Sequence, residues 1–213
     1  MTLRTKVLFA AVCVAVLVGS PAEAKEKIRI ARLPEATAAV PGAETKPVWG
    51  WVDFCRRYRG ECDSGRARAE DIKLDAAAWA VMDDVNRMVN QSIVPVTDQE
   101  HWGQPDRWDY PDDGKGDCED YVLLKRKLLI QRGFPRGALL ITVVIDLQGA
   151  GHAVLTAKTD HGDLILDNMR DEIIGWTATG YKFVKRQAQD DQNRWVSLQD
   201  NIQVPASVAA NRQ

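Results

Sequence analysis

The chain has 213 residues, of which 45% are hydrophobic, and its 28 basic and 30 acidic side chains leave a formal net charge of −2 at pH 7. This near-neutral balance gives no bulk attraction for nucleic acid or for anionic lipid. The length is sufficient for one domain with a proper hydrophobic core. We therefore expect a single globular domain and exclude a charge-driven nucleic-acid-binding or lipid-binding protein.

The first 24 residues have the features of a secretory signal. Arg4 and Lys6 precede an apolar run over residues 7–18, and small residues offer a cleavage site before Lys25. The apolar run is shorter than the roughly twenty residues that a membrane-spanning helix needs, so a retained N-terminal anchor is the weaker alternative. We expect a periplasmic or secreted protein with no membrane span after the signal is removed.

The rest of the chain divides by composition into three parts. Residues 25–48 are rich in Ala, Pro and Glu and predict a loose lead-in, in which Ile28 and Ile30 are candidates for a short edge strand. Tryptophan-rich sequence then opens the folded domain, expected over residues 49–203. Residues 204–213 are expected to form a flexible tail.

The cysteines carry information about the compartment and about chemistry. Cys13 leaves with the signal, so the mature chain keeps an odd number of cysteines, and in an oxidising compartment one thiol then stays unpaired or joins a partner. Cys55 and Cys62 flank a short turn-like run and can close a small disulfide loop. The alternatives are that both are thiols or that one pairs with Cys118. We take the bridge between Cys55 and Cys62 as the expectation.

A helix and a long loop are expected in the middle of the chain. Apolar side chains recur at steps of three or four over residues 71–91, which predicts an amphipathic helix with Asp71 or Asp75 as its N-cap. Residues 92–115 then predict a long loop rich in tryptophan and proline. Loops of this length are often functional. Its tryptophans either line a substrate cleft or cover one edge of the core.

Cys118 lies at the expected start of the next helix, after a turn-rich run over residues 111–116. The unpaired N–H groups and partial positive charge of a helix N-terminus favour thiolate over thiol. The neighbouring side chains of Asp117, Glu119 and Asp120 act in the opposite sense, because carboxylates raise the pKa of a thiol. The position suits a nucleophilic cysteine without establishing one.

The second half of the chain predicts an antiparallel sheet. Residues 139–146 are continuous and β-branched, as in a strand buried on both faces. Residues 152–158 and 163–168 alternate around a turn and predict a β-hairpin. Further strands are expected over residues 181–187 and 194–198.

The register of this hairpin brings two polar side chains together. If Thr159 pairs with Gly162, His152 lies opposite Met169 and has Asp167 as its diagonal neighbour on the same face of the sheet. A shift of one residue would place the imidazole and the carboxylate on opposite faces.

Cys118, His152 and Asp167 follow one another in the order and setting of a nucleophile, its base and the carboxylate that orients the base. The backbone N–H of Cys118 would help to stabilise an oxyanion. A metal site made from the same three residues is the alternative, but nothing nearby completes a usual set of ligands. The sequence has no His/Cys cluster with the spacing of a structural zinc site. It also has no phosphate-binding glycine-rich loop, and we expect no organic cofactor.

Several motifs taken together are specific for one family. These are GDCEDY entering a helix, LLITVV followed by GHAVL, GDLILDN closing the hairpin, and GYKFVKRQ. On these motifs, residues 79–195 resemble the bacterial transglutaminase-like cysteine proteinases of the papain-like transglutaminase superfamily. The resemblance implies an α+β fold, with the cysteine at the N-terminus of a helix packed against an antiparallel β-sheet. It also implies a Cys-His-Asp triad at Cys118, His152 and Asp167.

Local charge and the resemblance both indicate calcium. The crowding of Asp117, Glu119 and Asp120 at one helix start repels itself and opposes a thiolate, and a hard cation with oxygen ligands relieves both effects. A periplasmic protease of this superfamily that releases adhesins binds calcium through matching acidic residues. The alternative is that these carboxylates cap the helix or pair with Lys125 and Arg126 as solvated charges.

The expected function is therefore that of an exported, monomeric cysteine peptidase that acts on a protein or peptide substrate through a thioester. Transamidation or deamidation of glutamine on the same triad is the first alternative, because only the acceptor of the thioester differs. A non-catalytic peptide-binding protein that keeps the fold is the second. The lead-in and the tryptophan-rich loop over residues 92–115, which we call the approach loop, differ from those of the adhesin-releasing protease, so its substrate is not carried over.

Overall fold

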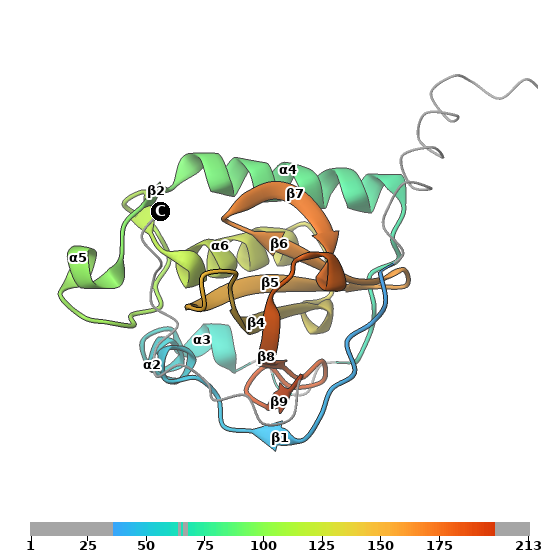
Figure 1. Ribbon diagram of the computed structural model, residues 1–213, viewed down its shortest axis with the longest axis horizontal. Helices are drawn as coiled ribbons and strands as arrows, with labels where there is room; N and C mark the ends of the chain where they lie inside the picture. Colours follow the sequence, from blue (N-terminus) through green and yellow to red (C-terminus); the bar gives the residue numbers. More distant parts are fainter. Residues whose placement is uncertain (1–35, 64, 66–67, 199–213) are drawn as a thin grey trace, which may run out of the picture. The chain divides into compact units, whose positions relative to one another are not determined.

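The computed structural model describes residues 36–63, 65 and 68–198 (Figure 1). The secretory signal, the expected edge strand at Ile28 and Ile30 and the tail over residues 204–213 lie outside the described residues. Within the described part, no helix has both the length and the apolar character needed to cross a bilayer.

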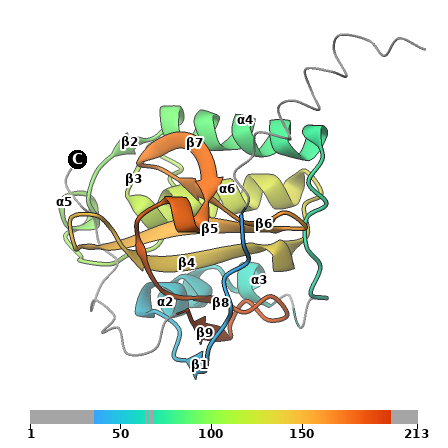
Figure 2. The same ribbon diagram turned by 45° about the vertical axis from the view of Figure 1, so that its right-hand side comes forward.

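A seven-stranded sheet forms the centre of the domain, in the order β1-β9-β8-β4-β5-β6-β7. Every neighbouring pair in it is antiparallel (Figures 1 and 2). Its strands are β1 (Glu44–Thr45), β4 (Leu139–Ile145), β5 (Gly151–Thr159), β6 (Gly162–Asp167), β7 (Arg170–Gly175), β8 (Lys182–Gln187) and β9 (Trp195–Ser197). The antiparallel sheet expected from the alternating sequences is confirmed.

The described part of the chain also contains five α-helices. They are α2 (Trp49–Arg57), α3 (Arg59–Cys62), α4 (Ala76–Ser92), α5 (Asp98–Trp102) and α6 (Cys118–Gln131), with short 3-10 helices η1 (Arg136–Ala138) and η2 (Trp176–Ala178). Helix α6 contacts the central strand β5, and α4 packs against both α6 and β7. The α+β architecture, with the cysteine helix on an antiparallel sheet, is confirmed.

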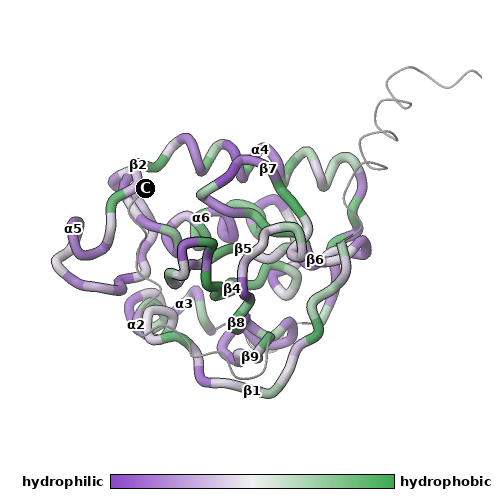
Figure 3. Tube along the Cα trace, in the orientation of Figure 1, coloured by the Kyte–Doolittle hydropathy of each residue, from purple (hydrophilic) through white to green (hydrophobic). Residues whose placement is uncertain are grey.

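The core lies mainly between these helices and one face of the sheet. Buried side chains of α4 and α6, such as Val85 and Leu129, meet Ile141 of β4 and Leu155 of β5. A smaller cluster around Phe183 covers the other face. Figure 3 shows the hydrophobic trace concentrated in the central strands and a hydrophilic trace around α5. Burial on both faces explains why β4 has a continuous apolar sequence, whereas the sequence of β5 alternates although that strand is buried as well.

The expected helix over residues 71–91 begins later than its periodicity suggested. Ile72 forms a bridge with Thr159 at the end of β5, and its N–H donates to the carbonyl of Lys158 at 2.9 Å. The side chain of Asp75 then caps α4 by accepting from the N–H of Ala78 at 2.8 Å. The end of β5 therefore holds Ile72 outside the expected helix, and Asp75 is the N-cap of α4.

The β5–β6 hairpin has the expected register, with Thr159 paired to Gly162 and Lys158 paired to Asp163. Gly162 has a φ of +106° and approaches the backbone of Ala36 so closely that a Cβ atom would lie 1.9 Å from its carbonyl oxygen. Only glycine suits this turn, because it combines a positive φ with no space for a side chain.

One detail of the expected register is wrong. His152 pairs with Val144 of β4, and Met169 is not among the partners of β5. The reason is that residues 168–169 form the turn into β7, where Asp167 pairs with Arg170. The main consequence of the register survives, because His152 and Asp167 share a face of the sheet and their side chains meet.

The described part of the lead-in, residues 36–48, packs against the sheet in place of the loose conformation expected. The N–H of Ala39 donates to Asp163 at 3.0 Å, Arg186 donates to the carbonyl of Ala39 at 3.1 Å, and Gly42 donates to the carbonyl of Ser197 at 2.7 Å. Backbone bonding of this kind is not visible in the composition, which alone suggested a loose segment.

The expected long loop over residues 92–115 has structure of its own. It contains α5 and strand β2 (Val94–Pro95), which pairs in parallel with β3 (Lys115–Gly116) just before the cysteine helix. Of its two tryptophans, Trp108 is fully buried and covers the core, whereas Trp102 is 39% exposed, so a cleft lined by Trp102 stays a prediction.

Candidate active site

The imidazole of His152 and the carboxylate of Asp167 form a buried pair at one end of the β5–β6 hairpin. His152 lies at the start of β5 and Asp167 ends β6, and His152 Nε2 is 2.8 Å from Asp167 Oδ1. The exposed fractions of the two residues are 3% and 0%. The sequence placed these two side chains together, and the structure does the same.

Asp167 is surrounded by donors. Besides His152, the N–H of Met169 donates to Oδ1 at 3.0 Å and the hydroxyl of Tyr181 donates to Oδ2 at 2.7 Å. Burial by itself would raise the pKa of Asp167, but the hydrogen bond and charge of His152, with the bonds from Met169 and Tyr181, lower that pKa to about 2. The carboxylate is therefore an ion at any physiological pH, held by the chain itself.

Tyr181 is a member of this group that the sequence did not identify. It lies just before β8, and its ring stands edge-on to the imidazole of His152 with 5.9 Å between the centroids. Burial and the charge of Asp167 raise the pKa of its hydroxyl, which stays a donor. The motif GYKFVKRQ contains this residue, but nothing in the motif alone connects its hydroxyl to Asp167.

Cys118 is the first residue of α6 and is 5% exposed. Its sulfur bonds with Glu119 Oε2 at 3.0 Å and also interacts with the backbone of Ala153, the residue after His152. The cysteine helix therefore presents Cys118 to the strand that carries the imidazole. Burial raises the pKa of the thiol well above its usual range, and the charges of Glu119 and Asp117 raise it further. At Cys118 these effects outweigh the N-terminus of the helix, which favours thiolate.

The carboxylates flanking Cys118 are buried and do not behave as solvated charges. Asp117 is the N-cap of α6, and its N–H donates to Asp120 at 3.3 Å as part of a capping box. Glu119 and Asp120 are 0% and 1% exposed, and no ion pair within the described residues joins them to a lysine or arginine. The expectation that these carboxylates cap the helix is right. The expectation that they are solvated charges is wrong, because the approach loop covers the first turn of the helix.

That covering loop adds a further carboxylate, Asp98, which the sequence did not single out. The N–H of Asp98 donates to Asp117 at 3.0 Å, and carboxylate oxygens of Asp98, Asp117 and Asp120 lie within 4.8 Å of one another. Burial first, and then the charge of Asp117, raise the pKa of Asp98 to about 7. We call Asp98, Asp117, Glu119 and Asp120 the acidic cluster.

The acidic cluster has unused acceptors. Asp117 Oδ1 and Glu119 Oε1 are buried and have no hydrogen-bond partner among the described residues. Burial and the neighbouring carboxylates raise the pKa of Glu119 and of Asp120 well above the usual range. Buried carboxylate oxygens that lack donors need either protons or a cation, and a set made of oxygens alone suits a hard cation such as calcium.

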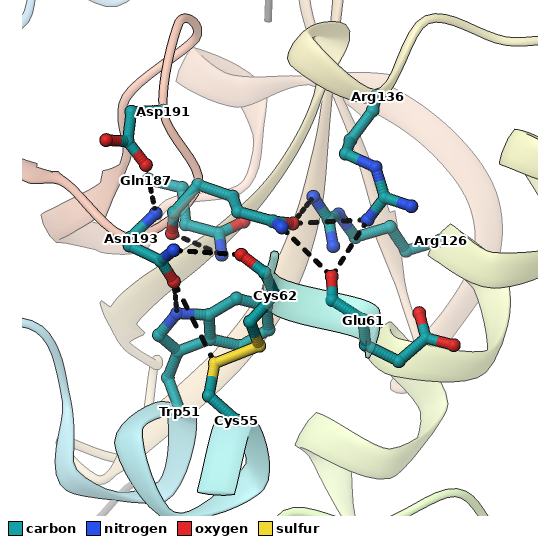
Figure 4. The surroundings of a disulfide bond; sticks show 10 residues. Trp51, Cys55, Glu61, Cys62, Arg126, Arg136, Gln187, Asp191 and Asn193 are labelled. Carbon is teal, nitrogen blue, oxygen red and sulfur yellow. Dashed lines mark hydrogen bonds between the residues drawn. A yellow bond between two sulfur atoms is a disulfide. The ribbon is translucent and has the colours of Figure 1, made fainter. Parts of the chain in front are cut away.

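The structure also joins Cys55 and Cys62 in a disulfide, with an S–S distance of 2.06 Å, and leaves Cys118 outside it. Figure 4 shows this bridge between α2 and α3. Asn193 holds its surroundings, because its side chain accepts from the indole N–H of Trp51 at 3.1 Å and donates to the carbonyl of Cys62 at 3.0 Å. The bridge therefore joins α2 to α3, and Asn193 attaches both helices to the turn before β9.

The other two histidines have partners of their own. His101 Nε2 is 2.8 Å from Asp113 in the approach loop, and His161 Nδ1 is 2.8 Å from Asp160 at the exposed hairpin turn. His161 is remote in the sheet from the end that carries His152, because the two lie at opposite ends of β5.

Comparisons with known proteins agree on one group of proteins. A family model described as bacterial transglutaminase-like cysteine proteinase matches residues 41–203. No curated protein matches the chain.

Solved structures of LapG from Legionella pneumophila are similar to this chain. A calcium-bound LapG is 27% identical with a TM-score of 0.50, covering 61% of this chain and 74% of that one. A second LapG structure is 29% identical with a TM-score of 0.49, covering 58% and 71%. An EGTA-treated LapG is 31% identical with a TM-score of 0.46, covering 51% and 62%.

Proposed function

Because the chain belongs to the bacterial transglutaminase-like cysteine proteinase family, we propose that it is an exported cysteine peptidase with Cys118 as nucleophile, His152 as base and Asp167 as the orienting carboxylate. The observation that carries the proposal is the buried 2.8 Å bond between His152 and Asp167. The residue after His152, Ala153, contacts the sulfur of Cys118 through its backbone. A nucleophile, a base and an orienting group in such an arrangement are the requirements of covalent acyl transfer.

The hydrogen bond to Asp167 assigns a role to each nitrogen of His152. An ionised carboxylate can only accept, so Nε2 carries the proton that it donates to Asp167. Nδ1 then has the free electron pair and takes the proton of the Cys118 thiol. Asp167 also stabilises the imidazolium that results, in addition to fixing the tautomer.

The reaction then proceeds through a thioester. The thiolate attacks the carbonyl carbon of the substrate, and the backbone N–H of Cys118 donates to the oxyanion. The C–N bond breaks as the imidazolium of His152 returns the proton to the leaving amine. Water, deprotonated by His152, attacks the thioester and releases the acid and the thiol. An amine in place of water would give transamidation.

The acidic cluster is proposed to hold calcium. Asp98, Asp117, Glu119 and Asp120 would supply the oxygen ligands, and the two buried acceptors without a hydrogen bond, Asp117 Oδ1 and Glu119 Oε1, fit a cation. When bound, the ion would supply positive charge that offsets the carboxylates opposing a thiolate at Cys118. The support from relatives is that one LapG structure is calcium-bound.

The remaining parts of the proposal rest on the sequence. The leader over residues 1–24 supports export to the periplasm or beyond, and the family supports a protein substrate. We propose a monomer that needs no organic cofactor.

Mass spectrometry of exported and surface proteins tests the activity, comparing cells that make the natural chain with cells that make Cys118→Ser. We expect new peptide termini that depend on Cys118. Deamidated glutamines or cross-linked chains in their place would replace peptidase by the first alternative. No difference between the two cell types, with both chains present in equal amounts, would favour a peptide-binding protein.

A further inference from the structure

We propose that Asn90 of helix α4 is a positioning residue that fixes the backbone of Asp167, and through it the imidazole of His152. The inference rests on the proposed function for its consequences in catalysis. Its structural part, that α4 determines the geometry of the bond between His152 and Asp167, can be tested without a substrate.

The side chain of Asn90 spans the turn that carries Asp167. Its amide nitrogen Nδ2 lies 3.0 Å from the carbonyl oxygen of Asp167, 3.0 Å from that of Arg170 and 3.0 Å from Asp171 Oδ1. One carboxamide therefore bonds the last residue of β6 and the first residues of β7. Because the –NH₂ group has only two hydrogens, these three acceptors share them, and each favours the same placement of the amide.

Asn86 repeats this contact one helical turn earlier. Its Nδ2 lies 3.0 Å from the carbonyl oxygen of Asp171 and 3.5 Å from that of Arg170, and the residue is fully buried. Residues four apart lie on the same face of a helix. Helix α4 thus uses two carboxamides on one face to hold the β6–β7 turn.

The turn needs such support because the regular ladder is interrupted there. The β6–β7 register shifts between Ile165 and Asp167, so the strands do not by themselves determine where Asp167 lies. Buried backbone carbonyls at an interruption must find other donors. Asn90 supplies one to Asp167 directly.

The carboxylate of the same residue is held on its other sides by Tyr181 and His152. Moving the backbone of Asp167 therefore changes either the bond to the imidazole or the bond to the tyrosine. Displacements of about 1 Å at a site of this kind cost on the order of a hundredfold in rate. Among the residues of α4, Asn90 is the one whose side chain contacts Asp167 itself.

The test compares Asn90→Ala and Asn90→Asp with Gln91→Ala in the mature chain. Gln91 is the exposed neighbour of Asn90 on the same helix, so Gln91→Ala removes an equal carboxamide without touching the turn. Asn90→Asp keeps the size of the side chain but removes both hydrogens that it donates.

Two readouts are measured on each folded variant, below its melting temperature. The first is the downfield imidazole N–H proton resonance of His152 in NMR, assigned by its loss in His152→Ala. The second is the rate at which iodoacetamide alkylates Cys118. We expect both Asn90 variants to shift or broaden the resonance and to slow alkylation by about tenfold or more, whereas Gln91→Ala matches the natural chain.

An unchanged resonance and alkylation rate in Asn90→Ala and Asn90→Asp would overturn the proposal. A lowered melting temperature with both readouts unchanged would overturn it too, since Asn90 would then only stabilise the fold. If instead the natural chain shows the resonance and its dependence on Asn90 but no turnover that depends on Cys118, the proposed function fails and the positioning role stands.

Discussion

Asp167 and the acidic cluster are both buried carboxylates of one small domain, yet their environments drive their pKa values in opposite directions. Asp167 accepts hydrogen bonds from His152, Met169 and Tyr181, and its pKa falls to about 2. In the cluster, carboxylates face one another, and burial raises the pKa of Asp98 to about 7. Burial is common to both places, so the difference lies in the neighbours: His152 faces Asp167, whereas the carboxylates of the cluster face one another.

The contrast separates what the chain supplies from what it must acquire. The His152–Asp167 pair is completed by protein groups and needs nothing from solution. The acidic cluster leaves buried acceptors that only protons or a cation can satisfy. One half of the candidate site is therefore preorganised, and the other half depends on conditions.

The largest effect is expected at the residue between these two regions. Cys118→Ser should reduce turnover by about 10⁴–10⁶-fold, because it removes the nucleophile and little else. The melting temperature should stay close to that of the natural chain. His161→Ala is the control for the histidine assignment, because His161 lies at the turn of the same strand pair. A loss of activity comparable to that of Cys118→Ser in this variant would contradict the assignment of His152 as the base.

Neutralising the satisfied carboxylate should be costly. Asp167→Asn should lower turnover by about 10²–10⁴-fold, because an amide no longer fixes the imidazole tautomer or stabilises the imidazolium. It should also lower the melting temperature at neutral pH. Asp160→Asn, beside the exposed His161, is the control. Equal activity and stability of Asp167→Asn and the natural chain would remove the basis of the comparison.

A buried cation offers a third case. Lys125 is fully buried, its Nζ has no hydrogen-bond partner among the described residues, and the charges that face it are Asp167 and Asp171. Burial lowers its pKa to about 7, against 10.5 for an ordinary lysine. Between these two pH values, Lys125 is therefore protonated in the unfolded chain and neutral in the folded chain. The free energy of unfolding consequently rises with pH over this range.

Lys125→Met should accordingly increase the free energy of unfolding at pH 7 by on the order of 1–4 kcal/mol. The difference from the natural chain should be largest at or below pH 7 and shrink as pH rises toward 10.5. Denaturant unfolding across this range measures it. A difference that is independent of pH would contradict the lowered pKa, because Lys125 would then bind its proton equally in the folded and unfolded chains.

The smallest effect is expected when one carboxylate of the acidic cluster is neutralised. In excess chelator, Asp98→Asn should raise the free energy of unfolding by on the order of 1–2 kcal/mol, because it relieves repulsion by Asp117. Calcium should raise the melting temperature and activity of the natural chain, and this response should be weakened in the variant. A melting temperature of the natural chain that is the same in chelator and in calcium would end the proposal of a calcium site.

How much of the site could be predicted from the sequence depended on whether a tight turn or a local motif fixes the contact. The hairpin register placed His152 beside Asp167 because two short strands and a tight turn leave few alternatives. The cysteine helix and the spacing of Cys55 and Cys62 are local features in the same sense.

The residues that were missed reach the site without a shared tight turn, although Tyr181 is no farther from Asp167 along the chain than His152 is. Asp98 reaches Asp117 through a folded loop, Tyr181 reaches Asp167 from the next strand but one, and Asn90 does so from a helix far earlier in the sequence. Each is an ordinary polar residue in its own neighbourhood. Only tertiary packing gives it a partner, so periodicity and motifs could not identify it.

The central claim is that the pair of His152 and Asp167 activates Cys118. The pH dependence of alkylation of Cys118 by iodoacetamide tests it most directly, read by peptide mass spectrometry in calcium for the natural chain and for His152→Ala. The account predicts rapid alkylation of the natural chain at neutral pH. In His152→Ala, alkylation should require a higher pH than in the natural chain, because burial raises the pKa of the thiol and no imidazole is left to take its proton. Identical pH profiles for the two proteins would contradict the claim.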